Sequence, residues 1–360
     1  MRMFSRGWLI AVLACVATAS LAAPLDALRT ADTQLEPWHG QAEIAYDAVN
    51  DTLDFLRIRA SDPVYGGSNV GDYKGYHLRG TYQLPQRFSL HADWWQRRIS
   101  YRADEQDLHS WQVAAQYNFF EAGHRTGSNY AVRLSAWGNA AGELSKSSPT
   151  ELFGRTLNTV KVADPEDKQV QLDFLGSWRL SNRFALSAFA GAGKSRVSVG
   201  AVSGTYIDGD GCKYNLSFAG NFAFADLAAP CGNFITARFT TPGPDIHQEV
   251  AYDARYFQFG GQLQWHSADW RLSGGYHYLK LDRDRVDDAV VSRGGSAQDR
   301  NHILIGEIAR KVGKTSAVFL RGQWMDKQFV GEIPFAYNSV TASKFASHYG
   351  LATVGFMVAY

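Results

Sequence analysis

Three side chains that could form a hydrolytic triad lie close together in the sequence. Ser89, His91 and Asp93 recur at every second position, so in an extended strand they would share one face. A nucleophile, a general base and a residue that orients the base are what acyl transfer requires. Along one strand such residues are about 6–7 Å apart at the backbone. This is too far for those contacts unless the side-chain conformations bring the functional groups together. We therefore expect them to line a polar face.

The first 22 residues have the features of a secretory signal peptide. Arg2 and Arg6 precede the apolar run Trp8–Val16, and small residues follow up to Ala22, where we expect cleavage. The run is too short for a membrane-spanning helix, which needs about 20 residues. We therefore predict that the chain is exported.

Only two cysteines, Cys212 and Cys231, follow this segment. An even pair in an exported chain indicates one disulfide, which would stabilise the segment it closes by roughly 3 kcal/mol. Metal binding is the competing interpretation, but no histidine or third cysteine lies at ligand spacing. The nearby run Asp208-Gly-Asp210-Gly could suggest a calcium loop. It lacks the regularly spaced oxygen ligands and the final glutamate that such loops contain. We expect no metal, no cofactor and no enzymatic activity.

The composition excludes a helical membrane protein. Of 360 residues, 45% are hydrophobic and 20% are charged, the mean hydropathy is -0.26, and no segment after residue 22 approaches about 18 uninterrupted apolar residues. The chain instead contains 10 Trp, 17 Tyr, 21 Phe and 34 Gly, which is typical of a β-barrel. In such a barrel lipid-facing and lumen-facing residues alternate, so their hydropathies cancel in any sequence window. A net charge of +1 gives no indication of a nucleic-acid partner.

Apolar and polar side chains alternate with a period of two through most of the chain, which predicts antiparallel strands. We count about twelve, an even number, with short turns alternating with long polar connections. The long connections are expected at 142–167, 202–250, 285–299 and 331–344. In a single-chain barrel the long loops would be extracellular and the short turns periplasmic. The predicted fold is therefore an all-β, transmembrane, up-and-down antiparallel barrel.

The domain limits follow from this pattern. Residues 23–40 show no periodicity and are interpreted as a periplasmic leader or short plug, and residues 41–360 as the barrel, with 201–250 as a large extracellular loop that holds the disulfide. The frame of the first strand stays open, because alternation occurs both at 42–48 and at 56–60. A soluble β-sandwich is the competing fold. It would need a second buried layer, yet these strands carry one apolar face opposite a polar one, which in a barrel lines the lumen.

The last strand carries the most specific signal. Val354, Phe356, Val358 and Tyr360 share one face, and the chain ends on an aromatic residue. This stretch resembles the closing strand of Gram-negative outer-membrane β-barrels, and the run Gly75–Tyr82 looks like that of many proteobacterial surface barrels. The resemblance implies an outer-membrane location, recognition of the final strand by the barrel assembly machinery, and outer-membrane lipid and lipopolysaccharide as neighbours.

With the apolar faces outward, Arg and Lys outnumber Asp and Glu on the lumen side. The candidate lumen-lining residues are Arg79, His91, Asp93, Arg97, Arg133, Asp173, Arg179, Arg271, His277, Glu307 and Arg321. One interpretation is a narrow, mildly anion-preferring pore for a small anionic solute. The other is a lumen plugged by its own side chains, in a barrel that acts through its extracellular loops. About twelve strands lie between filled eight-stranded barrels and open barrels of 16–18 strands. A lipid-modifying hydrolase is less favoured, because no polar cluster faces lipid.

Overall fold

The computed structural model of this chain describes residues 25–31, 40–49, 72–84, 87–101, 104–120, 127–147, 150–152, 155–243, 245–339, 341–346 and 348–360. The expected signal peptide and the alternation at 56–60 lie outside these residues. No helix within them is long and apolar enough to cross a membrane.

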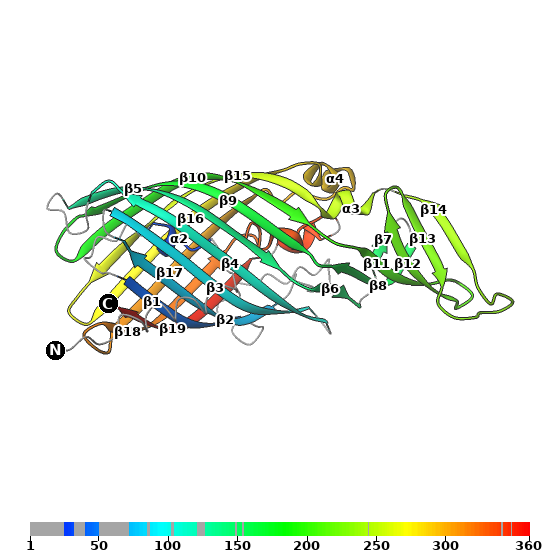
Figure 1. The fold of residues 1–360 in the computed structure, drawn as a ribbon, viewed down its shortest axis with the longest axis horizontal. Coiled ribbons are helices and arrows are strands. Elements are labelled where there is room, and N and C mark those ends of the chain that lie inside the picture. The colour runs from blue at the N-terminus through cyan, green and yellow to red at the C-terminus, as the bar shows by residue number, and fades with distance from the viewer. Residues whose placement is uncertain are drawn as a thin grey trace, which may run out of the picture.

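Twelve strands form one closed antiparallel barrel (Figure 1). They are β1 (Gly40–Val49), β2 (Asp72–Gln83), β3 (Phe88–Tyr101), β4 (Asp104–Asn118), β5 (Ser128–Ala140), β9 (Glu166–Arg179), β10 (Phe184–Ser198), β15 (Tyr252–His266), β16 (Trp270–Arg283), β17 (Arg300–Lys311), β18 (Ser316–Met325) and β19 (Tyr349–Ala359). The last strand pairs with the first, in the register Ile44↔Phe356. The alternation at 42–48 is therefore the first strand. Closure confirms the predicted barrel and excludes an open sandwich.

The two ends of the barrel differ, and we name them by what they carry. The turn end holds the tight connections β9–β10, β15–β16 and β17–β18, and there the backbones of Gly40 and Tyr360 hydrogen-bond to each other. The sheet end carries a second sheet that projects beyond the barrel (Figure 1).

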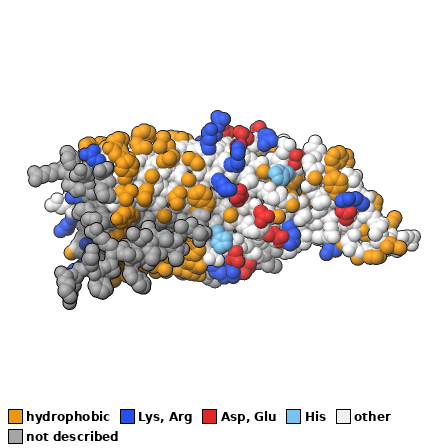
Figure 2. Space-filling model, viewed as in Figure 1, with side chains coloured by type: hydrophobic (Ala, Val, Ile, Leu, Met, Phe, Trp, Pro, Cys, Tyr) orange, Lys and Arg blue, Asp and Glu red, His pale blue; other side chains and the backbone are white. Residues whose placement is uncertain are grey.

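The face of the strands that carries the apolar side chains changes along the barrel, from the outer face to the inner face, as β4 illustrates. Towards the turn end, Val113 is exposed on the outer face and Gln112 is buried on the inner face. Towards the sheet end, Asp107 is exposed outside and Leu108 is buried inside. β4 has 15 residues, more than the 9–11 or so that a strand needs to cross a bilayer. Exposed apolar side chains on strands around the barrel, among them Leu90, Phe174, Leu263 and Leu320, form an apolar belt in the turn-end half. On the face shown in Figure 2, charged side chains gather over the sheet-end half, and we call this region the charged zone.

The long connections expected at 142–167 and 202–250 are present, but they carry regular strands that the sequence pattern did not predict. They contribute a seven-stranded antiparallel sheet in which β8 pairs with β11. Its strands are β6 (Glu143–Lys146), β7 (Thr150–Leu152), β8 (Arg155–Ala163), β11 (Val202–Ile207), β12 (Lys213–Ala219), β13 (Phe222–Leu227) and β14 (Arg238–Pro242). Between β8 and β11 lie two complete barrel strands, so no local hairpin signal marks this pairing. Helix α3 (Ile246–Val250) returns the chain to the barrel.

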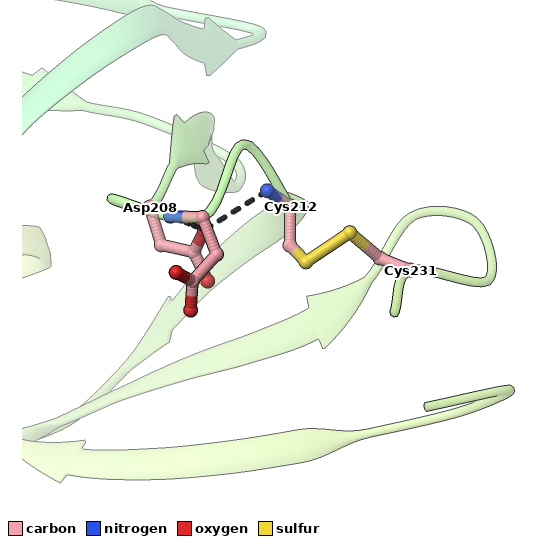
Figure 3. Close-up of a disulfide and its surroundings, with 4 residues drawn as sticks. Asp208, Cys212 and Cys231 are labelled. Atoms are coloured by element: carbon pink, nitrogen blue, oxygen red, sulfur yellow. Dashed lines mark hydrogen bonds between the residues drawn. A yellow bond between two sulfur atoms is a disulfide. The ribbon is translucent and has the colours of Figure 1, made fainter. Parts of the chain in front are cut away.

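The predicted disulfide between Cys212 and Cys231 is present in this sheet (Figure 3). A carboxylate oxygen of Asp208 accepts hydrogen bonds from the backbone N–H groups of Asp210, at 3.0 Å, and of Cys212, at 2.9 Å. Gly211 adopts φ +83 in this turn, a conformation that glycine tolerates without steric cost. The Asp208-Gly-Asp210-Gly run is therefore a hydrogen-bonded turn next to the disulfide.

Replacing both Cys212 and Cys231 with serine should loosen the second sheet and leave the barrel intact. The bond closes a segment with a sequence separation of 19, for which the chain-entropy model gives about 3 kcal/mol. We expect faster proteolytic cleavage within 208–243, with unchanged heat-modifiable electrophoretic mobility of the barrel. Equal cleavage rates in the serine variant and the parent chain would contradict this expectation.

Candidate functional site: the barrel lumen

The inner wall places the candidate lumen residues as follows. Most are buried, namely Arg79, His91, Asp93, Arg97, Arg133, Asp173, His277, Glu307 and Arg321. Arg271 is half-buried and Arg179 is exposed, and both border a chamber at the turn end. On the outer face of β19, Val354, Phe356 and Tyr360 are exposed and Val358 is half-buried.

A short helix, α2 (Ala27–Thr30), lies across the lumen. Its N-cap residue Asp26 accepts hydrogen bonds from the backbone of Leu28 and Arg29, which satisfies donors that a helix start leaves free. Gln262 of β15 donates to the Leu28 carbonyl at 3.1 Å, and Arg133 of β5 donates to the Arg29 carbonyl at 3.3 Å. Four helical residues are not stable alone in water, so the contacts with the barrel wall hold this helix.

Ion pairs fix the same segment to the wall. Asp26 Oδ2 lies 2.6 Å from Arg79 Nη1 and 3.3 Å from Arg321 Nη1, and Arg29 Nη2 lies 2.7 Å from Asp93 Oδ1. Burial alone would raise the pKa of Asp26, but the two guanidinium groups outweigh it and lower the pKa from 3.8 to about 2. Asp26 is therefore ionised in the docked segment. Residues 25–31 form the first layer across the lumen.

Acid should release this first layer. Because the pKa of Asp26 is lower when docked than when free, ionised Asp26 favours docking fully above pH 3.8, and this contribution of about 2 kcal/mol is lost as the pH falls from 3.8 to 2. A nitroxide on Leu28→Cys should stay immobile from pH 6 to about pH 4 and become mobile as the pH falls towards 2.

The matched control for the acid experiment is Asp26→Asn, which keeps a good N-cap but removes the charge. The same label in Leu28→Cys/Asp26→Asn should lose this pH dependence. Circular dichroism at each pH separates release of the segment from unfolding of the barrel. A label that stays immobile at pH 2 in a folded barrel would contradict the expectation.

The connection from β18 to β19 forms a second layer nearer the sheet end. It contains the short 3-10 helices η4 (Pro334–Ala336) and η5 (Ala342–Ala346). Arg97 of β3 donates to Glu332 at 2.5 Å, Asn139 of β5 donates to the Glu332 carbonyl at 3.0 Å, and Tyr252 of β15 donates to the Pro334 carbonyl at 2.7 Å. The segment is thus anchored on several sides of the barrel.

Apolar packing holds this second layer. Phe329, Ile333 and Phe345 have no exposed surface and belong to one core cluster with Leu279 of β16 and Ile303 of β17. Residues 331–344 were expected to form a loop that leads to the last strand and lies on the outside with the other long loops. The structure instead folds it inward, because the inner wall of the sheet-end half is apolar. The unusually apolar composition of 329–337 was the signal that could have indicated this.

A polar chamber of about 410 Å³ lies between the first layer and the turn end. Its cationic lining comes from Arg29, Arg79, Arg179, Arg183, Arg271, Lys311, Lys314 and Arg321, and its acidic lining from Glu43 and Glu307. Four of these cations, Arg29, Arg79, Arg271 and Arg321, pair with the carboxylates of Asp93, Asp26 and Glu307. The rest of the cationic lining comes from Arg179, Arg183, Lys311 and Lys314. The volume is within the range of about 300–1,000 Å³ that is common for small-molecule sites.

The structure does not assemble Ser89, His91 and Asp93 into a triad. Ser89 Oγ accepts a hydrogen bond from Asn118 at 3.2 Å, His91 Nδ1 lies 3.2 Å from Thr81 Oγ1, and Asp93 pairs with Arg29. Each residue has a partner outside the trio. The three side chains therefore belong to the polar network of the inner wall, as the strand spacing predicted.

The apolar belt around a closed barrel, with a polar inner wall, decides the structural class. The protein has the fold of the outer-membrane β-barrels. Neither a protein-family model nor a curated protein matches the sequence.

Three solved structures illustrate the range of similar barrels. The CymD monoaromatic hydrocarbon channel has 10% sequence identity and a TM-score of 0.40. The match covers 91% of this chain and 90% of the CymD chain. The NanC porin has 8% identity and a TM-score of 0.39, with 88% and 98% coverage. The translocator domain of the autotransporter NalP from Neisseria meningitidis has 10% identity and a TM-score of 0.43, with 89% and 86% coverage. At these values the similarity concerns the fold alone.

Proposed function

We propose that this protein is an outer-membrane channel that admits small anionic solutes and is held closed at rest by two layers of its own chain. The observation that carries the proposal is the positively charged chamber, in which Arg183, Lys311 and Lys314 lie near the turn end. A channel needs a region that concentrates its solute without binding it too tightly. The many cations of the chamber would concentrate an anionic solute. The exposure of the chamber to solvent would keep the binding weak.

The orientation follows from the barrel itself. In single-chain outer-membrane barrels the short turns are periplasmic and the long connections extracellular, so the chamber opens to the periplasm and the second sheet stands outside the cell. The expected signal peptide and the apolar face of Val354, Phe356 and Tyr360 support export and assembly by the barrel assembly machinery. The apolar belt would contact outer-membrane lipid and lipopolysaccharide. No enzymatic step is needed for this function.

Ion selectivity in planar bilayers tests the proposal. With a KCl gradient, the reversal potential should show a preference for chloride over potassium. Lys311→Gln/Lys314→Gln should reduce that preference, because it removes two of the cations that line the chamber. The matched control is Arg196→Gln, at an exposed surface ion pair of the sheet-end half, which should leave the selectivity unchanged. Because the parent chain is held closed at rest, silence would contradict the channel only if well-folded Asp26→Asn/Glu332→Gln were silent as well over many insertions.

A closed barrel that binds a partner through its second sheet is the other candidate function. The observation in its favour is an exposed apolar tip, where Ile235 is 80% exposed and Phe234 and Phe239 are also exposed. Exposed apolar groups gathered at one place often mark interaction sites. Loss of surface adhesion in Phe234→Ser/Ile235→Ser, with unchanged conductance, would favour this function over transport.

A further inference from the structure

Two wall arginines share a carboxylate that does not belong to the wall. Arg79 on β2 and Arg321 on β18 both contact Asp26 Oδ2, at 2.6 and 3.3 Å. Asp26 comes from the segment that lies across the lumen, and its other oxygen caps the helix. Among the described residues the buried Nε of Arg79 has no hydrogen-bond partner. The arginine pair is therefore incompletely satisfied by the wall and by Asp26 together.

The charges around this pair balance only while Asp26 is present. Arg321 also contacts Glu307 at 2.6 Å and Glu43 at 3.2 Å, and Arg271 contacts Glu307 at 2.7 Å. If Arg79, Arg271 and Arg321 are counted with Asp26, Glu43 and Glu307, and His77 is counted with Asp47, the arginine cluster holds three guanidinium groups and three carboxylates. Without Asp26, one buried positive charge loses its counter-ion, which is strongly unfavourable. A single incoming carboxylate would restore the balance.

Next to Arg79 and Arg321, His77 lies between Asp47 and the same Glu43. Its ring nitrogens lie 2.9 Å from Glu43 and 2.7 Å from Asp47. This pairing uses part of the negative charge of Glu43, so Glu43 alone cannot neutralise both arginines. The need for the Asp26 carboxylate is thereby increased.

The arginine pair borders the chamber, while Asp26 itself lines a neighbouring cavity of about 30 Å³ that the two arginines also border. Arg79 and Arg321 both line that space, together with the neutral hydrogen-bonding groups of Gln262, Gln264 and Ser273. Amide and hydroxyl groups complement hydroxyl groups on a ligand. The surroundings therefore fit a small hydroxylated molecule that carries one negative charge.

We propose that Arg79 and Arg321 form a binding site for the carboxylate of a small hydroxylated monocarboxylic acid, and that Asp26 occupies this site as a tethered competitor. The inference rests on the proposed channel function for its physiological meaning. A solute carboxylate that displaces Asp26 also releases the first layer across the lumen. The apparent affinity is lowered because only the fraction of molecules with Asp26 undocked can bind.

Gluconate binding to the purified full-length protein in detergent tests the site without any measurement of transport. Asp26→Asn should bind gluconate at least about tenfold more tightly than the parent chain in calorimetry, because the charged competitor is gone. Asp26→Asn/Arg321→Gln should lose that gain, and neutral sorbitol should bind to none of the variants. The matched control is Asp210→Asn in the second sheet, which should behave like the parent.

A reversible crosslink provides an independent measurement. A Cβ built on Gly275 of β16 would lie 3.2 Å from the Ala27 Cβ, slightly closer than the distance of about 3.5–4.5 Å in disulfides. Ala27→Cys/Gly275→Cys should therefore hold the segment in place when oxidised. We expect no gluconate binding in the oxidised state and binding after mild reduction, with the parent chain under the same reductant as the control.

Equal gluconate affinity in the parent chain and Asp26→Asn, or full binding to the oxidised crosslinked protein, would overturn the inference. Failure of the channel function is distinguishable, because it would leave tight, Arg321-dependent gluconate binding in Asp26→Asn together with electrically silent protein. Binding that is equally strong for phosphate and gluconate would also overturn the monocarboxylate assignment, since a dianion overcompensates one missing charge.

Discussion

Arg97→Met should lower the stability of the second layer by about 3–5 kcal/mol, the range measured when one partner of a buried ion pair is removed. Arg97 and Glu332 have side-chain exposures of 0% and 2%, so Glu332 would remain buried without a counter-charge. Arg97 also donates to Ser110 and Asn139, and these bonds would be lost as well. Hydrogen exchange of 326–346 should become much faster, while the strands of the turn-end half should exchange as before.

Two comparisons make the Arg97 experiment specific. Arg97→Met/Glu332→Leu should recover most of the loss, because an apolar pair of similar volume often replaces a buried ion pair at little cost. Burial raises the pKa of Glu332 above 4.5 although Arg97 opposes this shift. The penalty in Arg97→Met should therefore be small below pH 4.5 and grow as the pH rises. A penalty independent of pH, or no recovery in the double variant, would contradict the account.

Val113→Arg should destabilise the barrel in lipid by about 2–4 kcal/mol, the cost of an arginine at the bilayer midplane. Val113 is 46% exposed on the outer face of β4, within the apolar belt. His109→Arg is the matched control on the same strand and the same face, where Asp107 lies two residues away and Gln96 lies opposite. It should change stability by no more than about 0.5 kcal/mol. Denaturant unfolding in lipid vesicles measures both values.

This pair of variants tests the position of the membrane along the strand. If the two arginines had equal costs, the apolar belt would not be the lipid-facing zone. If His109→Arg were the costlier variant, the membrane would surround the sheet-end half instead. Either outcome would contradict the location of the membrane around the turn-end half.

The barrel was predictable because period-two alternation is a local signal. The run from Gly75 to Tyr82 and the face of Val354, Phe356 and Tyr360 each specify which side of a strand meets lipid, without knowledge of its partners. The alternation of inner-face and outer-face positions along each strand also identified Arg79, Asp93 and Arg321 as inner-wall candidates. The even number of strands and the closure between the first and last strand followed from the positions of the turns.

The parts that sequence analysis did not find depend on contacts between distant residues. Asp26 meets Arg321 across 295 positions. A short plug was one of two interpretations of residues 23–40, but the lack of periodicity there gave no indication of the wall residues that it would contact. Strand β8 pairs with β11 beyond two barrel strands, so the second sheet has no hairpin signature. The inward position of Phe329 and Phe345 required knowing that the inner wall changes from polar to apolar. That change is visible only after the strands are aligned in register.

Single-channel recording of a chain with both layers loosened tests the central claim most directly. Asp26→Asn/Glu332→Gln removes the carboxylates that anchor the first and second layers. We predict frequent, anion-preferring conductance steps in this variant, rare openings in the parent chain, and silence in oxidised Ala27→Cys/Gly275→Cys that reverses on reduction. A loosened variant that retains the folded barrel but never conducts would contradict the claim that the two layers close a channel.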